Sequence, residues 1–310
     1  MDKLVIETDG LTKNYGKIVA VDRLSLRVPR GGVFGLLGPN GSGKTTTMGM
    51  LLGLVRPSSG LIHLLGSNEH GVSGQALRRI GAIVEVPSFY PYMSGRDNLL
   101  YFQGITCRRD PAEVDRLLDM VDLSSRAGSK FSTYSMGMKQ RLGIAYAMLG
   151  NPELLFLDEP TNGLDPVGMA EVRELIRDMA SEGRTVLLSS HLLHEVEQVC
   201  DNVSILSKGR LIAQGGVAEL LRQQGAVRLK TTDDREAERL INDLPWVQGT
   251  RTEDGYLVTM VPPERSWELT AALSEQGVFV SEMAPLQVSL EQYFLEVTEE
   301  DASRGLEVNS

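Results

Sequence analysis

The chain has 310 residues, of which 42% are hydrophobic and 23% charged. These values are ordinary for a folded protein and exclude wholesale disorder, and the length predicts about two domains. The formal net charge of −10 is confined to the end of the chain: residues 1–224 hold 24 basic and 24 acidic side chains, and residues 225–310 hold 7 and 17. We therefore expect two units with different roles, 1–224 and 225–310.

Several classes of protein are disfavoured by these properties. An acidic chain argues against a nucleic-acid binder, which needs a basic face. No apolar run reaches the roughly 18–20 residues of a membrane helix, and the first ten residues lack the pattern of a signal peptide. Two cysteines, Cys107 and Cys200, are too few for a disulfide scaffold and fit a reducing cytoplasm.

The first elements in chain order predict a nucleotide site. Residues 4–7 and 18–28 alternate apolar and polar side chains, as in half-buried antiparallel strands. Residues 32–37 are continuously apolar, which favours a strand buried on both faces, and an apolar helix is expected from Thr45 to Leu54. The loop between them comprises Gly38, Pro39, Asn40, Gly41, Ser42, Gly43, Lys44 and Thr45. Strand, glycine-rich loop and helix are the context of a phosphate-binding loop.

The residues of this loop suit phosphate chemistry. Its three glycines let backbone N–H groups point inward at phosphates, and the helix N-terminus adds its dipole there. Lys44 can bridge the β- and γ-phosphates, and the Thr45 hydroxyl can hold Mg²⁺. A turn that merely closes a strand–helix unit is the alternative, but the complete match in the correct context favours the phosphate loop.

Two acids follow a second buried strand at residues 154–157. Asp158 is placed to reach Mg²⁺, and Glu159 can polarise a water in line with the γ-phosphate, as a general base would. A strand ending in solvated acids is the alternative. A third strand, residues 185–190, ends at His191, which we expect to close over the γ-phosphate. His191 to Glu195 has the look of a helical metal motif, but its order is not that of a zinc protease.

One segment distinguishes among phosphate-loop families. Residues 134–141, Tyr-Ser-Met-Gly-Met-Lys-Gln-Arg, open a predicted helix that ends near Leu149. This segment resembles the signature sequence of ATP-binding-cassette (ABC) ATPases, and the resemblance extends over about residues 4–221 with every element in family order. It implies an α/β P-loop NTPase fold with a RecA-like core, an antiparallel β subdomain and a helical subdomain at about residues 88–150.

The resemblance also implies roles for individual residues. The nucleotide contacts that it implies are Tyr15 on adenine, the loop residues Gly38, Pro39, Asn40, Gly41, Ser42, Gly43, Lys44 and Thr45, then Thr46, Ser135, Gly137 and Asp165. The implied Mg²⁺ ligands are Thr45, Asp158 and Glu85, and the implied catalytic residues are Glu159, His191 and Glu85. In the family, two such domains pair head to tail, and each signature caps the γ-phosphate that its partner holds. ATP and Mg²⁺ are thus the expected ligands, and a homodimer the expected assembly.

Two positions depart from the family pattern. Glu85 stands where a glutamine is usual, and the bacitracin-resistance and lantibiotic-immunity exporters often share this substitution. Met136 replaces the usual first glycine of the signature. We expect activity to survive, because Ser135 and Gly137 remain and a carboxylate can still accept from water or coordinate the metal.

Aromatic side chains gather in residues 89–92, within a chain that has only 5% of them. For Phe89, a place in the core of the helical subdomain is at least as well supported as a contact with another protein. By family resemblance, the segment Phe89–Met93 docks a cytoplasmic helix of a separate transmembrane permease. The chain is then expected at the cytoplasmic face of the membrane.

The acidic end predicts a small α+β domain. Strands are expected at residues 226–231, 246–250, 255–261 and 278–283, helices at 234–244, 264–276 and 289–298, and a frayed tail from Glu299. The order of these elements suits a split βαβ fold, and it resembles the accessory domain of drug exporters. Its regulatory or dimer-stabilising role is a hypothesis.

Taken with the resemblance, these features predict the ATPase subunit of a bacterial exporter of a drug, antibiotic or peptide. The alternative is a slow or non-hydrolysing ATP-gated assembly subunit, because Glu85 and Met136 are compatible with slow turnover. DNA-repair ATPases of the superfamily are disfavoured, since the 114 residues from Lys44 to Asp158 contain no heptad coiled coil.

Overall fold

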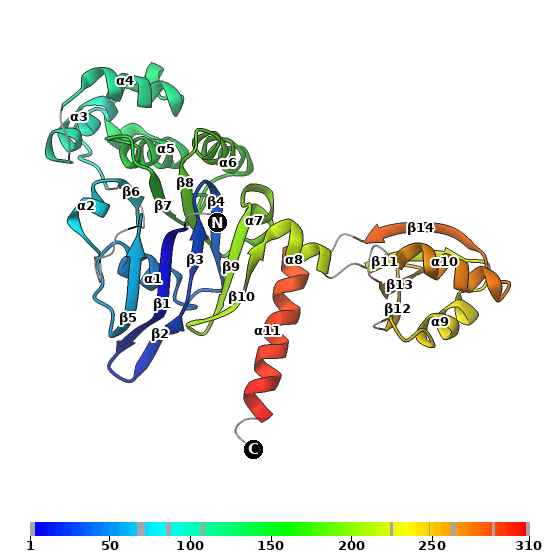
Figure 1. Cartoon of the computed structure of the whole chain (residues 1–310). Helices are drawn as coiled ribbons and strands as arrows, with labels where there is room; N and C mark the ends of the chain where they lie inside the picture. The colour runs from blue at the N-terminus through cyan, green and yellow to red at the C-terminus, as the bar shows by residue number, and fades with distance from the viewer. Residues whose placement is uncertain are drawn as a thin grey trace. The chain divides into compact units, whose positions relative to one another are not determined.

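The computed structural model describes residues 4–66, 72–84, 88–106, 109–223, 226–247, 249–261, 265–286 and 289–307. Its tertiary contacts divide the chain into two compact units, residues 1–214 and 215–310 (Figure 1). Glu85 lies outside the described residues. No helix in the described ranges is both long and apolar enough to cross a membrane.

A six-stranded sheet forms the centre of the first unit. Its order is β10-β9-β4-β8-β7-β6. The strands are β4 (Gly32–Leu37), β6 (Ile80–Ile83), β7 (Leu154–Asp158), β8 (Thr185–Ser190), β9 (Asn202–Ser207) and β10 (Arg210–Gly216). β4 pairs in parallel with β8 and β9, and β7 with β6 and β8. Because parallel strands end at one edge, the residues that follow β4, β7 and β8 come together there.

The second sheet of this unit is antiparallel. β1 (Leu4–Tyr15) pairs with β2 (Ile18–Leu24), β3 (Arg27–Pro29) and β5 (Ser59–Leu64). The two sheets share one hydrophobic core with helix α1 (Lys44–Leu51), in which Ile6, Leu36 and Phe156 are fully or almost fully buried. The predicted antiparallel strands are confirmed, although β1 is longer than the sequence pattern indicated.

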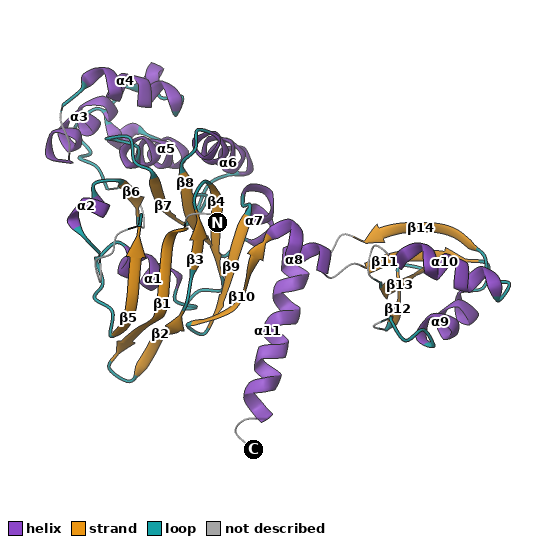
Figure 2. Ribbon diagram, in the orientation of Figure 1, coloured by secondary structure: helices purple, strands orange, loops and turns teal. Residues whose placement is uncertain are grey.

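The remaining helices of the first unit flank the parallel sheet and form its helical part (Figure 2). They are α2 (Gly74–Leu77), α3 (Gly95–Thr106), α4 (Pro111–Met120), the 3₁₀ turns Ser124–Arg126 and Phe131–Thr133, α5 (Met136–Ala147), α6 (Pro166–Ser181) and α7 (Leu193–Val199). Phe89 is 8% exposed and packs edge to face on Phe102, Phe131 and Tyr146. Of the two roles left open for Phe89, the place in the core of the helical part is therefore the correct one.

The second unit contains a four-stranded antiparallel sheet of order β12-β13-β11-β14. Its elements are α8 (Val217–Gln223), β11 (Ala226–Thr231), α9 (Asp234–Asn242), β12 (Thr250–Glu253), β13 (Tyr256–Met260), α10 (Ser266–Glu275), β14 (Val280–Leu286) and α11 (Leu290–Glu307). Side chains of α9 and α10, among them Ile241 and Leu269, bury one face of the sheet. This order and pairing are those of a split βαβ fold, as predicted.

The largest boundary differences from the prediction in the second unit lie at β12 and α11. β12 is Thr250–Glu253 rather than residues 246–250. Residues 254 and 255 have φ of 51° and 76° and close a two-residue hairpin, which extends the pairing to Glu253 opposite Tyr256. α11 continues to Glu307 instead of fraying at Glu299. The segment after Thr298 is rich in good helix formers and has no glycine before Gly305, so nothing in it ends the helix.

Candidate functional site

The loop after β4 is shaped by glycines that no other residue can replace without movement. Gly38 has φ of 151°, and a Cβ there would lie 2.3 Å from the carbonyl oxygen of Leu206. Gly43 has φ of 102°, and its Cβ would lie 2.7 Å from the carbonyl oxygen of Ala20. The loop is therefore seated directly on the backbones of β9 and β2, which fixes the direction of its N–H groups.

Lys44 is buried under this loop at the first position of α1. Its Nζ donates to the carbonyl oxygen of Gly38 at 2.7 Å, and its side chain is 6% exposed. The buried hydroxyl of Ser42 has no hydrogen-bond partner among the described residues. Thr45 is exposed at the start of the helix, and Thr46 is half-buried beside it. A cation, a free hydroxyl and an open helix N-terminus form a cradle that suits an anion.

The two acids after β7 occupy different environments. Asp158 is buried, and the Ser189 hydroxyl of β8 donates to its Oδ1. Glu159 has φ of 48°, a left-handed conformation that is uncommon outside glycine. Its N–H donates to the hydroxyl and the carbonyl oxygen of Ser189, at 3.0 and 3.2 Å. Ser189 thus hydrogen-bonds to both acids.

The Glu159 carboxylate lies between two cationic or potentially cationic groups. Its Oε1 is 3.6 Å from Lys44 Nζ, and its Oε2 is 2.9 Å from Nδ1 of His191. Because a carboxylate only accepts, this contact requires Nδ1 of the ring to carry a proton. Lys44, Asp158, Glu159 and His191 thus meet at the edge where β4, β7 and β8 end, as the sequence predicts.

Ser189 was missed by the sequence analysis. It lies in the predicted strand 185–190, next to the strand end that pointed to His191. The pairing of β7 with β8 places Asp158 opposite Ser189. The signal is the polar end of the strand, Ser189 and Ser190 after three apolar residues, but the partner of Ser189 becomes identifiable only once the register of the sheet is known.

The signature segment lies beside the loop that precedes α6. Ser135 caps α5 by accepting from the N–H of Met138 at 3.2 Å. A Cβ on Gly137 would lie 4.0 Å from Leu164, and one on Gly163 would lie 3.7 Å from the Met136 side chain. Ser135 and Met136 are exposed at the start of this helix, next to the loop that carries Asp165.

Asp165 and Tyr15 occupy two further edges of the first unit. Asp165 caps α6, accepting from the N–H of Gly168 at 2.9 Å. Tyr15 ends β1, is 48% exposed, and has Lys13 Nζ 4.8 Å from its ring centroid. An exposed aromatic face at a strand end is available for stacking on a planar ligand.

Metal binding has to be tested on the residues present. No group of three or more His, Cys, Asp or Glu side chains in the described ranges could hold a metal ion by itself. Mg²⁺ keeps waters and substrate phosphates as ligands, so one hydroxyl and one carboxylate suffice. Thr45 and Asp158 fit that set.

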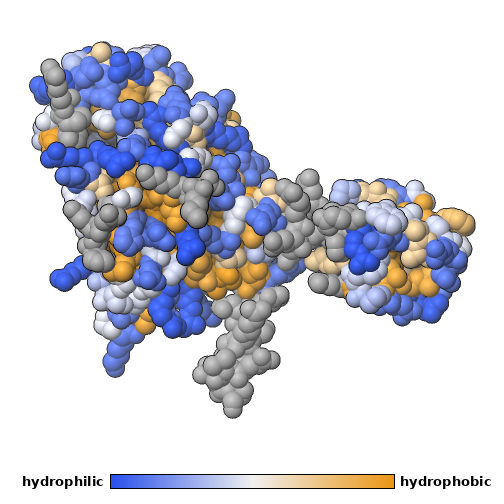
Figure 3. Space-filling view, viewed as in Figure 1, coloured by the Kyte–Doolittle hydropathy of each residue, from blue (hydrophilic) through white to orange (hydrophobic). Residues whose placement is uncertain are grey.

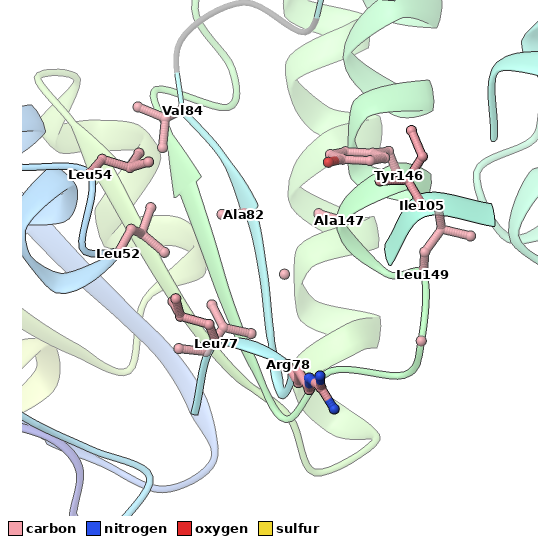
Figure 4. Close-up of a pocket in the computed structure, with 13 residues that line it drawn as sticks. Leu52, Leu54, Leu77, Arg78, Ala82, Val84, Ile105, Tyr146, Ala147 and Leu149 are labelled. Carbon is pink, nitrogen blue, oxygen red and sulfur yellow. The ribbon is translucent and has the colours of Figure 1, made fainter. Parts of the chain in front are cut away.

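An apolar cleft opens between the sheet and the helical part. Leu52, Leu54, Leu77 and Val84 line one side of it, and Ile105, Tyr146 and Leu149 line the other (Figure 4). Figure 3 shows hydrophobic surface on the larger unit in this area. Leu54 and Ile105 are 70% and 66% exposed, and Tyr92 is 84% exposed. The aromatic segment is thus divided between a buried Phe89 and an exposed Tyr92.

Comparisons with known proteins agree with this geometry. Residues 21–162 match the family model described as ABC transporter. The chain is 37% identical to the uncharacterized ABC transporter ATP-binding protein YdbJ of Bacillus subtilis, over 99% of this chain and all of that protein. It is 39% identical to the bacitracin transport ATP-binding protein BcrA of Bacillus licheniformis, over 94% of this chain and 97% of the relative. A solved ATP-binding subunit of an ABC transporter, 31% identical, superposes with a TM-score of 0.62 over 71% of this chain and 92% of its own. The chain belongs to the family of ABC transporter ATP-binding proteins, which are P-loop ATPases.

Proposed function

We propose that this ABC ATPase is the ATP-hydrolysing subunit of a bacterial exporter, and that its cargo is an antibiotic, drug or peptide. The observation that carries the hydrolytic role is the convergence of Lys44, Asp158, Glu159 and His191 at one edge of the parallel sheet. The near full-length likeness to a bacitracin transport ATP-binding protein supports the class of cargo.

In this proposal, each side chain has one task in hydrolysis. Lys44 and the loop N–H groups bind the phosphates, and Tyr15 orients the nucleotide by stacking on adenine. Thr45 and Asp158 would hold Mg²⁺, which when bound would neutralise part of the phosphate charge. Glu159 acts as the general base and takes a proton from the attacking water. His191, whose Nδ1 lies 2.9 Å from Glu159 Oε2, orients the Glu159 carboxylate.

Glu85 is proposed to assist at the metal or the attacking water, although it lies outside the described residues. A carboxylate there in place of an amide adds negative charge next to a triphosphate. Slower hydrolysis is its expected effect. Replacing Glu85 with Gln, the usual residue of the family, tests this through kcat.

A head-to-tail homodimer completes the proposed site. Ser135 and Met136, at the start of α5, are exposed beside Gly163 and Leu164. In a second copy, they would meet the γ-phosphate that Lys44 binds. Asp165 and its loop would then lie in the interface, and loss of the γ-phosphate would loosen the dimer.

The apolar cleft is the proposed docking site for a membrane-spanning permease. A short helix of that subunit would place its apolar side against Leu54 and Ile105, and the exposed Tyr92 would supply a further contact. Such docking would place the chain at the cytoplasmic face of the membrane. The acidic second unit contains none of the residues of the proposed ATP site, and we assign it an accessory, regulatory role.

Two measurements test the proposed function. Lys44→Ala is expected to abolish ATP binding, measured by equilibrium titration, and to abolish phosphate release. Lys130→Ala, at an exposed lysine of the helical part, serves as the matched control and should retain both activities. In vesicles containing the chain and its co-purifying permease, ATP should drive transport of a bacitracin-type peptide. Wild-type hydrolysis by Lys44→Ala would contradict the proposed site, and ATP-independent transport would contradict the exporter role.

A further inference from the structure

An ion pair connects the two helices that follow the proposed catalytic segments. Arg173 of α6 places Nη1 3.3 Å from Oε1 of Glu195 on α7, and the two side chains are 18% and 13% exposed. The same Nη1 donates to the side-chain oxygen of Gln198, and Arg177 donates to the Gln198 carbonyl oxygen. Two arginines of α6 therefore bind one face of α7.

The Arg173–Glu195 ion pair lies within about two turns of the N-termini of both α6 and α7. α6 begins after Asp165, which caps it, and Arg173 follows about two turns later. α7 begins at Leu193, two residues after His191, and Glu195 lies about one turn after that histidine. The pair therefore joins the helix that follows Asp165 to the helix that follows His191.

The same pair also lies against the segment that follows Glu159. Pro160 and Thr161 line one small cavity together with Arg173 and Glu195. Thr161 is 6% exposed. Glu159 itself holds φ of 48°, a conformation that persists only when its surroundings enforce it. Packing beneath the next two residues provides part of that enforcement.

A role limited to stability does not account for these groups well. Oε2 of Glu195 is buried without a hydrogen-bond partner in the described ranges, so its charge depends on Arg173. Replacing a buried ion pair with apolar residues of similar size is often neutral or stabilising. What the pair supplies, and an apolar contact would not, is a directional link between two segments.

From these contacts we infer that Arg173 and Glu195 are positioning residues for ATP hydrolysis. They hold the turn at Glu159 and the strand end at His191 so that the carboxylate and the ring stay 2.9 Å apart. Neither touches the reacting atoms. This inference rests on the proposed roles of Glu159 and His191, and the experiment below separates the two.

The test measures kcat, KM for ATP and thermal stability of the purified full-length chain. Glu195→Gln is expected to lower kcat about 10- to 100-fold, because a displacement of about 1 Å can cost that much. KM should stay within about threefold, since the phosphate loop that binds ATP is untouched. Arg173→Lys should retain more activity than Arg173→Leu, and the double reversal Arg173→Glu/Glu195→Arg should recover part of the kcat lost in either single reversal.

Glu153→Gln is the matched control, because it removes the carboxylate of an ion pair with Arg79 at the start of β7, the end of the strand opposite to Asp158. It should leave kcat unchanged. Wild-type kcat in Glu195→Gln would overturn the inference, as would kcat and KM changing in parallel. If Glu195→Gln does not fold, the double reversal decides: a folded protein without recovered kcat overturns the inference. If Glu159→Gln and His191→Ala keep wild-type turnover, the proposed function fails instead.

Discussion

Gly38 offers a sharp test of how the phosphate loop is built. In Gly38→Ala, the added Cβ would lie 2.3 Å from the backbone oxygen of Leu206, about 1 Å closer than ordinary contact, and 2.5 Å from the Ser42 hydroxyl. The oxygen of Leu206 belongs to a strand in the middle of the sheet, so the loop must yield. A shift of about 1 Å in a positioning loop costs up to about 100-fold in rate. The φ of 151° at residue 38 adds about 1–3 kcal/mol of backbone strain to an alanine there.

The assay compares Gly38→Ala with Gly183→Ala. Gly183 also has positive φ, 90°, but a Cβ there has nothing within 4 Å, so it isolates the backbone strain. Both variants should lower the melting temperature, by about 2–4 °C for each kcal/mol in a unit of this size. Only Gly38→Ala should lower kcat/KM for ATP by about 10²-fold. A Gly38→Ala enzyme within threefold of wild type would refute the reasoning.

Three other outcomes follow from the structure. Arg79 and Arg30 lower the pKa of Glu153 to about 2. The ion pairs of Glu153 with these arginines therefore stabilise the fold above about pH 4.5, and this contribution is lost as pH falls from 4.5 toward 2. The side chains of Arg79 and Glu153 are about 40% exposed, so their ion pair contributes at most about 1 kcal/mol to stability. The melting-temperature difference between wild type and Glu153→Gln should shrink over that pH range. A constant difference would contradict the lowered pKa of Glu153. Phe89→Ala should lower the free energy of unfolding by about 3–5 kcal/mol, measured by denaturant titration. Tyr92→Ala should change it by less than about 0.5 kcal/mol yet weaken permease-stimulated ATPase activity.

Much of the fold was predictable because local patterns and packing agree. Continuous apolar runs identified β4 and β7, and β8 was predicted at residues 185–190. The acids and the histidine at the ends of β7 and β8 converge with the loop after β4, as parallel strands require. The glycine-rich loop was identified from residue type and context alone. The element order of the second unit was also predicted, with errors at the start of β12 and the end of α11, where turn chemistry and helix propensity set the boundaries.

The rest depends on contacts between segments far apart in the sequence. Ser189 and Arg173 gain their significance from partners 31 and 22 residues away, and only the pairing of β7 with β8 and the packing of α6 on α7 bring them together. The pattern also could not decide the environment of Phe89, because a proline-framed aromatic segment suits a core and a surface equally. Packing against three other rings decided it.

The measurement that tests the central claim most directly is single-turnover and steady-state phosphate release by Glu159→Gln. If Glu159 is the general base, the rate should fall at least about 100-fold, while ATP binding persists and the chain elutes as an ATP-dependent dimer in size-exclusion chromatography with light scattering. Turnover at the wild-type rate would contradict the account, because the contacts of Glu159 with Lys44 and His191 would then have no part in hydrolysis.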